Sequence, residues 1–459
     1  MMAHLTDVND TDLLGAIRLG ATAMAAVFNA DDPRGVAFFD AVALPEPRLA
    51  FSDVHSEAHI PGRHLNGLLA AEGLAGVAID DDAVRRHRAA LLFSLSGEVP
   101  LPLNRARIDG PLEHFCQHNV REGLHGLAAL VRWRADDEAL AVATRSVAFI
   151  AGHWQAPDRW SVPISPPACR GLTLVQGLGR AIGPLVKLWQ ATGHEPAIYL
   201  ARRVADAVIA SGAFPPDGAY RPDLLGHHTH STTSTLSSLA LLADATDDAA
   251  LLARVAAFYR TGLWSIRDEL GWAIESTAPE ANPDKGEGNT SGDIVETALI
   301  LARRGGSGAE EAAHDAHRIV LAHLLPSQLR DVSWIPASAG TDDGTRNVAD
   351  RLCGTWGFPA PYGHDPIGLE QIKFNLDIVG GVVASLAEVA AAGPWTGRVP
   401  TAPAVELELQ HRTRLIRVRL QGDTVEAMDA MGARLRDSFD SWPVSSQAFI
   451  HGLNETVAR

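Results

Sequence analysis

The sequence predicts an all-α fold: an (α/α)6 barrel over residues 1–395, followed by a small appendage over residues 396–459. Three observations lead to this prediction. Apolar residues recur at helical spacing in about a dozen separate segments. Consecutive helices are joined alternately by short turns and by long loops rich in Pro, Gly, Trp and His. The pattern repeats at a period of roughly sixty residues, as in stacked helical hairpins.

Each expected helix is recognised by its apolar stripe and, at several starts, by a suitable capping residue. The first has Ile17 and Met24 on one face, and Asp10 or Thr11 can cap it. Pro61 suits the first turn of the second helix. The expected helical segments are 11–29, one starting near 61, 81–96, 114–134, 136–149, 171–192, 195–211, 229–244, 247–267, 291–304, 308–324 and 374–391.

The lengths of the connections indicate how the hairpins are arranged. Short turns lie within hairpins, at 134–139, 192–197, 245–250 and 305–310. Long loops lie between hairpins, for example at 151–169, 212–228 and 326–373. Hairpins with all their long connections at one end can close into a ring with a pocket at that end. An open α-solenoid is the structural alternative, but it leaves the long loops unexplained.

The C-terminal appendage has a different pattern. Residues 405–422 contain alternating apolar and polar patches typical of strand, whereas residues 423–439 have a helical pattern. The predicted appendage is therefore a strand region plus a helix, which packs on the barrel or mediates dimerisation.

Composition and charge exclude several classes of partner. The net charge is −16 and no run of Lys or Arg occurs, so we expect no nucleic-acid partner. No apolar run reaches the roughly eighteen residues of a membrane span, and the first residues lack the pattern of a signal peptide. Cys116, Cys169 and Cys353 lie far apart, so we expect no disulfide framework and a reducing, cytoplasmic location.

The most polar connection runs from Gly271 to Glu296, between two strongly helical segments. Polar loops of this length usually have a function. Its acidic residues are Glu275, Glu280, Asp284, Glu287, Asp293 and Glu296. Glycoside hydrolysis takes two carboxyl groups, so the loop is interpreted as the rim of a carbohydrate site. The alternative is that these acids are solvated or cap the next helix, where negative charge is favourable.

Histidine-rich stretches mark two further helix starts. His228 and His230 precede a run of Ser and Thr, and His118 opens another hairpin. No carboxylate follows His230 at a familiar metal-ligand spacing. Substrate binding, proton transfer or packing at the helix start is therefore expected, and no metal. The polar stretch containing Arg63 either caps the second helix or faces the substrate.

Residues 170–209, 228–244 and 286–304 resemble segments of six-hairpin glycosidase-like proteins. Within that superfamily the order of motifs is most similar to the β-L-arabinofuranosidase-type glycoside hydrolases, over roughly residues 50–390. The resemblance implies an (α/α)6 barrel that acts on sugars. It also implies that Glu275 corresponds to the family's acid/base, and that Glu287 corresponds to the Glu of its Glu-x-Cys motif.

The sequence departs from that family at the cysteine positions. Asn289 replaces the Cys of the motif, and the helix that should open with a Cys-Cys pair instead has Asp377 nearby. A zinc site with three cysteines and a glutamate is therefore impossible at these positions. The large C-terminal domain of the family is also missing.

We therefore expect a carboxylate mechanism without cofactor or metal. Glu275 is predicted to be the general acid, with Asp377 or Glu287 as base or nucleophile, and burial near Trp272 is expected to raise the pKa of one of them. The predicted substrate-binding residues are His228, His230, Trp272, His118, Arg63, Asp293, Trp356 and His364.

Three functions fit this interpretation. The first is a glycoside hydrolase acting on an oligosaccharide or glycoside, as a monomer or homodimer. The second is a sugar epimerase, isomerase or polysaccharide lyase that uses His or Tyr bases. The third is a non-catalytic carbohydrate-binding barrel. The mass of the product distinguishes the first two, because hydrolysis adds water whereas isomerisation and elimination do not.

Overall fold

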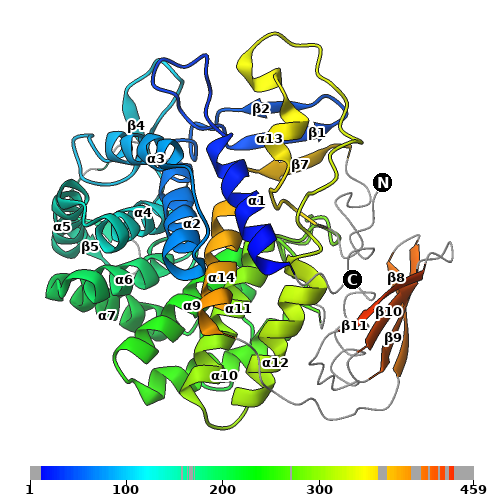
Figure 1. The fold of residues 1–459 in the computed structure, drawn as a ribbon. Helices are drawn as coiled ribbons and strands as arrows, with labels where there is room; N and C mark the ends of the chain where they lie inside the picture. The colour runs from blue at the N-terminus through cyan, green and yellow to red at the C-terminus, as the bar shows by residue number, and fades with distance from the viewer. Residues whose placement is uncertain are drawn as a thin grey trace.

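Six helices form a closed inner ring in the computed structural model, which confirms the predicted (α/α)6 barrel (Figure 1). The structure describes residues 12–393 except 157, 158, 163, 165–168, 170, 269, 270 and 360–369, and four strands between 405 and 438. Each inner helix contacts the next, and the last contacts the first. In ring order they are α2 (Ile60–Ala75), α4 (Val120–Arg134), α6 (Ile182–Thr192), α9 (Thr229–Ala245), α11 (Gly288–Arg304) and α14 (Ile378–Ala392).

A second set of helices surrounds this ring, and each of its members packs on one inner helix. The outer helices are α1 (Leu13–Ala25), α3 (Asp81–Ser94), α5 (Asp137–His153), α7 (Glu195–Ala210), α10 (Ala249–Arg260) and α12 (Ala309–Ile319). Two short helices, α8 (Pro222–Leu225) and α13 (Val348–Leu352), lie in long loops. No helix in the described part of the chain is long and apolar enough to cross a membrane.

The first ten residues of the inner helix α9 are mainly Ser and Thr, although the helix is buried on nearly all sides. Ser and Thr inside a helix can satisfy their hydroxyls by bonding to carbonyls of the preceding turn. Thr233, Ser234 and Ser237 do so, at 3.2 Å from the carbonyl oxygens three residues earlier. A polar sequence therefore fits the crowded centre of the barrel without unpaired hydroxyls at these three positions.

Small sheets occupy the long loops. One sheet has the order β2 (Arg48–Ala50), β1 (Asp40–Leu44), β7 (Ile372–Asn375), with all pairs antiparallel. Two hairpins pair β3 (Leu103–Arg105) with β4 (Leu112–Phe115), and β5 (Trp154–Gln155) with β6 (Arg159–Trp160). Because β7 ends just before α14, and β1 and β2 precede α2, the first sheet lies at the end of the barrel where the inner helices begin (Figure 1).

The appendage is an antiparallel sheet, which corrects the prediction of a strand plus a helix. Its order is β11 (Arg434–Ser438), β10 (Thr424–Met428), β9 (Arg414–Gln421), β8 (Val405–His411). The predicted helix over 423–439 contains two of these strands. In such short segments the alternation Thr-Val-Glu-Ala-Met fits strand as well as helix, and pairing with β9 decides between them.

Cys116 and Cys169 form a disulfide with their Cα atoms 5.2 Å apart, so the expectation of no disulfide was wrong. Cys353 is free. The pairing joins positions 53 residues apart, a distance at which sequence spacing indicates nothing about contact. The folded chain brings the start of the α4 region against the loop after α5.

Candidate active site

Charged and polar side chains gather where the six inner helices begin. Helix N-termini carry partial positive charge, which favours carboxylates at this end of the barrel. We call this group the N-terminal cluster. Its members are His59, Arg63, His118, Asn119, Arg121, Glu122, Arg180, His228, His230, Glu287, Asn289, Asp293 and Asp377.

One buried carboxylate, Glu122, holds three arginines together. Its Oε1 lies 2.6 Å from Arg63 Nη2, 3.0 Å from Arg121 Nη1 and 3.1 Å from Arg180 Nη2. Burial alone would raise the pKa of Glu122, but these arginines hold it well below its usual range. Glu122 is therefore a fixed negative charge at the centre of the cluster.

Asp377 is anchored through one oxygen only. Its Oδ2 accepts a hydrogen bond from Arg63 Nη1 at 2.8 Å and lies 3.1 Å from His59 Nε2. Its Oδ1 is buried and has no hydrogen-bond partner among the described residues. Burial would raise the pKa of Asp377, but Arg63 and His59 hold it below its usual range. An ionised carboxylate with one free oxygen is suited to act as a base or nucleophile.

Glu287 has contacts to both of its oxygens. Oε2 lies 3.1 Å from His228 Nε2 and Oε1 lies 3.3 Å from His230 Nδ1. The Asn289 amide also donates to Oε1 at 3.1 Å. Burial opposes ionisation, but the contact with His228 lowers the pKa of Glu287. Both oxygens of Glu287 are thus already engaged.

Asp293 lies deeper in α11, six residues after Glu287. Its Oδ2 is 3.3 Å from His230 Nε2 and accepts from Thr233 Oγ1 at 3.2 Å, while Oδ1 is 3.4 Å from Arg121 Nη2. Burial raises the pKa of Asp293 to about 7 in spite of Arg121. This is the opposite direction from Glu287 and Asp377, so the cluster contains carboxyl groups of differing acidity.

Four histidines of the cluster and His55, which precedes His59 in the chain, form a continuous row of five rings. The ring centroids of His55 and His59 are 5.4 Å apart, those of His59 and His118 5.6 Å, those of His118 and His228 5.5 Å, and those of His228 and His230 5.7 Å. Burial lowers the pKa of His118 and of His230 well below the usual value, and nearby arginines add to the effect. These two rings are therefore neutral near pH 7.

Glu275 lies at the edge of the cluster. Its carbonyl accepts from the Thr229 amide at 3.1 Å, which fixes it beside the start of α9. Its carboxylate is 24% exposed and lies 3.6 Å from Lys285 Nζ. Glu275 therefore lies on the rim, where the next residue, Ser276, pairs with His228. Glu287 and Asp377, in contrast, are buried.

The two tryptophans predicted to bind substrate lie in the protein interior. Trp272 is 3% exposed and donates its indole N–H to the Pro359 carbonyl at 2.8 Å. Trp356 is fully buried and donates to the Leu324 carbonyl at 2.6 Å. Both indoles are used for packing and loop anchoring, which corrects their assignment. His364 lies outside the described residues.

Sequence reasoning missed Arg180 as a member of the cluster. It considered His59 and Glu122 only as parts of polar stretches that could face the substrate, and gave neither residue a specific role. Each of the three is a charged or polar residue that lies at or just before the start of an inner helix and is buried there. That pattern is a usable signal, because unpaired charges are rarely buried in such a helix.

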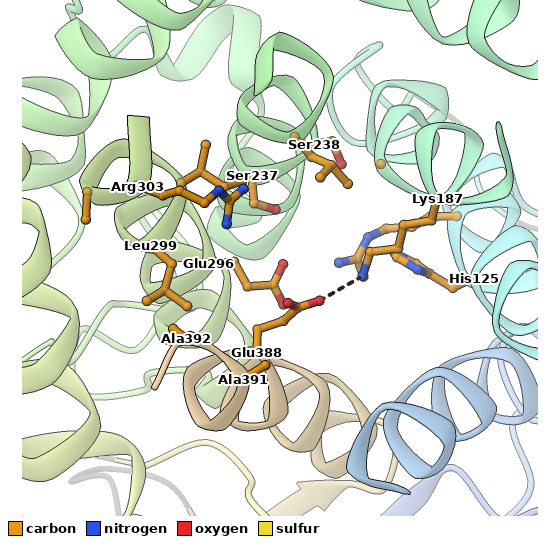
Figure 2. A pocket seen from close by; sticks show the side chains of 15 residues that line it. His125, Lys187, Ser237, Ser238, Glu296, Leu299, Arg303, Glu388, Ala391 and Ala392 are labelled. Atoms are coloured by element: carbon orange, nitrogen blue, oxygen red, sulfur yellow. Dashed lines mark ion pairs between the residues drawn. The ribbon is translucent and has the colours of Figure 1, made fainter. Parts of the chain in front are cut away.

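A cavity of about 500 Å³ opens at the opposite end of the barrel, near the C-terminal ends of the inner helices (Figure 2). Lys187 and Glu388 face each other across it at 4.0 Å. A space of about 20 Å³ within the N-terminal cluster is lined by Arg121, His230 and Asp293, and it shares Lys187 and Glu296 with the lining of this cavity. Arg121 is the one member of the N-terminal cluster that also lines this cavity. A larger space of about 730 Å³ lies elsewhere, beside α10 and α12.

A comparison with protein-family models finds no match, and neither does a comparison with curated protein sequences. Solved structures do match. A sugar epimerase from a ruminal bacterium has a TM-score of 0.54 at 14% identity, over 82% of this chain and 98% of that chain. An unsaturated glucuronyl hydrolase specific for heparin has a TM-score of 0.53 at 11% identity, over 83% and 96%.

An α-1,6-mannanase from Salegentibacter sp. is also similar, with a TM-score of 0.50 at 11% identity, over 83% of this chain and 99% of the mannanase. None of these three is a β-L-arabinofuranosidase, so that closer resemblance stays a prediction. At these identities the likeness establishes the fold alone: this chain is an (α/α)6 barrel, like the glucuronyl hydrolase, the epimerase and the mannanase.

Proposed function

We propose that this protein is a glycoside hydrolase that acts on an oligosaccharide or glycoside at the N-terminal cluster. The observation that carries the proposal is the state of Asp377, an ionised, buried carboxylate with one free oxygen. It lies among arginines and histidines suited to hold sugar hydroxyls or a sugar carboxylate. The likeness in fold to two glycoside hydrolases supports the same class of reaction.

In this proposal Asp377 is the base or nucleophile. Arg63 and His59 fix Oδ2, so Oδ1, which is buried and has no partner among the described residues, is the oxygen proposed to take a proton from water or to attack the anomeric carbon. The distance between the two catalytic carboxyl groups then sets the stereochemical outcome: about 5 Å for retention of the anomeric configuration and about 6.5–9.5 Å for its inversion. Glu287 is less suited to attack, because both of its oxygens already have partners.

Glu275 is proposed as the general acid. It is on the rim, where the leaving group of a substrate bound over the cluster would lie, and Lys285 is its neighbour. His118 and His228 lie between this rim and Asp377, with ring centroids 5.5 Å apart, and are proposed to bind substrate hydroxyls. Asp293 and His230 lie deeper in the barrel and are proposed to hold His118 and His228 in position.

The proposal is tested by Asp377→Asn and Glu275→Gln on a panel of glycosides and oligosaccharides. Removing a general acid, base or nucleophile lowers kcat by about 10²–10⁴-fold, so both variants should lose activity by that factor. Glu275 is partly exposed, so its variant should keep the wild-type melting temperature. Glu280→Gln is the matched control, because Glu280 is an exposed acid of the same loop. Full activity in Glu275→Gln and Asp377→Asn would contradict the assignment.

A second candidate is a sugar epimerase or a lyase, and the row of five histidines favours it. A neutral imidazole can remove a proton from a sugar carbon, and the similar ruminal structure is an epimerase. The product distinguishes these activities. Hydrolysis adds the mass of water, a lyase gives an unsaturated sugar that absorbs in the ultraviolet, and an epimerase leaves the mass unchanged. Sugar binding without turnover would instead indicate a non-catalytic barrel.

A further inference from the structure

We propose that His228, His230 and Glu287 form a binding site for a divalent transition-metal ion, with Zn²⁺ as the first candidate. Their potential ligand atoms, one from each side chain, all lie within 4.8 Å of one another. This replaces the expectation of a metal-free site. In the metal-bound protein it also replaces hydroxyl binding by His228, because both of its ring nitrogens then have partners. The proposal does not rest on the proposed function, because Glu275 and Asp377 are not among the ligands.

The distances suit a metal that is bound by all three side chains. His228 Nε2 is 3.1 Å from Glu287 Oε2, and His230 Nδ1 is 3.3 Å from Glu287 Oε1. Ligand atoms about 2.0–2.2 Å from a tetrahedral Zn²⁺ are themselves about 3.3 Å apart. These two distances reach different oxygens of Glu287, and the three ligand atoms, one from each side chain, lie within 4.8 Å of one another. A metal shared by all three therefore requires the side chains to move together by up to about 1.5 Å.

The other nitrogen of each imidazole is already oriented by a hydrogen-bonding partner. His230 Nε2 lies 3.3 Å from Asp293 Oδ2, and His228 Nδ1 lies 2.9 Å from Ser231 Oγ. Metal-bound histidines almost always have such a partner, most often a carboxylate, which fixes the tautomer and turns the free nitrogen toward the metal. Both rings have this arrangement, with the free nitrogens directed at Glu287.

The backbone holds the ligands in place before any metal binds. The Thr229 amide donates to the Glu275 carbonyl at 3.1 Å, and the Glu287 amide donates to the Ala273 carbonyl at 3.3 Å. The loop between 273 and 287 therefore connects the start of α9 to the start of α11. A site on two helix starts joined in this way is rigid, and rigidity favours metal affinity.

The ligand set indicates the class of metal. Two imidazoles and one carboxylate suit Zn²⁺ and other first-row transition metals better than Mg²⁺ or Ca²⁺, which prefer oxygen ligands. Three protein ligands leave a fourth position open for water or substrate. The His228 side chain is 29% exposed, which provides an entry path at the mouth of the barrel, next to His118.

The test is metal binding by the full chain after treatment with a chelator and dialysis. Titration calorimetry with Zn²⁺ should give one site per chain. His228→Ala and Glu287→Gln should each weaken binding at least 100-fold, and Ser231→Ala about 10–100-fold through the lost orientation of His228. His227→Ala is the matched control, because His227 is the adjacent histidine and contacts only Thr277 among the described hydrogen bonds. It should bind Zn²⁺ as the wild type does.

If a variant fails to fold, a second measurement on the wild type still tests the proposal. Co²⁺ bound to the wild type should give the strong visible absorption of a four-coordinate ion, and Zn²⁺ should displace it. Absence of stoichiometric binding to the wild type would overturn the proposal. So would unchanged affinity in His228→Ala and Glu287→Gln, or loss of binding in His227→Ala. Loss of glycosidase activity in Asp377→Asn with intact Zn²⁺ binding separates this site from the proposed chemistry.

Discussion

Glu122 is the residue on which the buried charges of the barrel depend. Its carboxylate faces three buried guanidinium groups, and Asp377 and Asp293 supply further negative charge beside Arg63 and Arg121. Removing one member of a buried ion pair leaves its partners uncompensated, which costs about 3–5 kcal/mol. An exposed pair contributes about 0–1 kcal/mol, so the two kinds of site should respond very differently to the same substitution.

Glu122→Gln should therefore lower the free energy of unfolding by about 3–5 kcal/mol, because Arg63, Arg121 and Arg180 lose their common counter-charge. Glu138→Gln is the control, since Glu138 is 63% exposed in its pair with Arg88, and it should change stability by less than about 1 kcal/mol. Urea denaturation of both variants checks the prediction. Equal losses in the two variants would contradict it.

Among the helices, α2 makes the closest contacts with its neighbours. A Cβ atom on Gly67 would lie 2.6 Å from the Gly380 carbonyl oxygen of α14, and one on Gly62 would lie 2.0 Å from the Glu122 carbonyl oxygen of α4. These glycines let three inner helices approach closely enough for Arg63 to reach both Glu122 and Asp377. The geometry of the site thus depends on small residues that have no chemical role in it.

Gly67→Ala is expected to destabilise the protein by about 1–3 kcal/mol, the usual cost of inserting a methyl group where there is no space. Alanine is otherwise the better helix former by about 1 kcal/mol, so the loss measures the close approach of α2 and α14. Gly152→Ala in α5 is the control with the opposite sign, because its Cβ would meet nothing within 4 Å. It should be neutral or slightly stabilising. Thermal and urea unfolding of both variants distinguish the two effects.

Across the whole molecule, several histidines are buried in their neutral form. Burial lowers the pKa of His64 to about 4, and lowers those of His87 and His125 well below the usual value. In the unfolded chain such groups gain a proton below about pH 6.5. The unfolded state therefore binds more protons than the folded state between these pH values, and stability must fall as the pH falls.

We expect the free energy of unfolding to be maximal above about pH 6.5 and to fall between pH 6.5 and 4 by up to about 1.4 kcal/mol per pH unit for each such histidine. His64→Gln should reduce this slope by the share of one histidine, because His64 itself no longer titrates. Urea denaturation at several pH values measures the slope. An identical slope in the variant and the wild type would show that His64 does not contribute.

Much of the site could be anticipated because its residues occur at recognisable places in the chain. His228, His230, Glu287 and Asp293 stand at helix starts next to a long polar loop, and they do lie together in the cluster. The two tryptophans were misplaced, because sequence pattern cannot distinguish an exposed indole from one buried under the same loop. Trp356 is fully buried, with its N–H bonded to a main-chain carbonyl.

By itself the sequence determined the helices, their grouping into hairpins and the end of the barrel at which the long loops gather, because periodicity and turn length are local properties. Only the tertiary structure decided which distant residues meet. His59 and Asp377 are 318 positions apart and are joined because closing the ring brings α2 against α14. The disulfide and the sheet of the appendage likewise depend on long-range pairing, which no local pattern encodes.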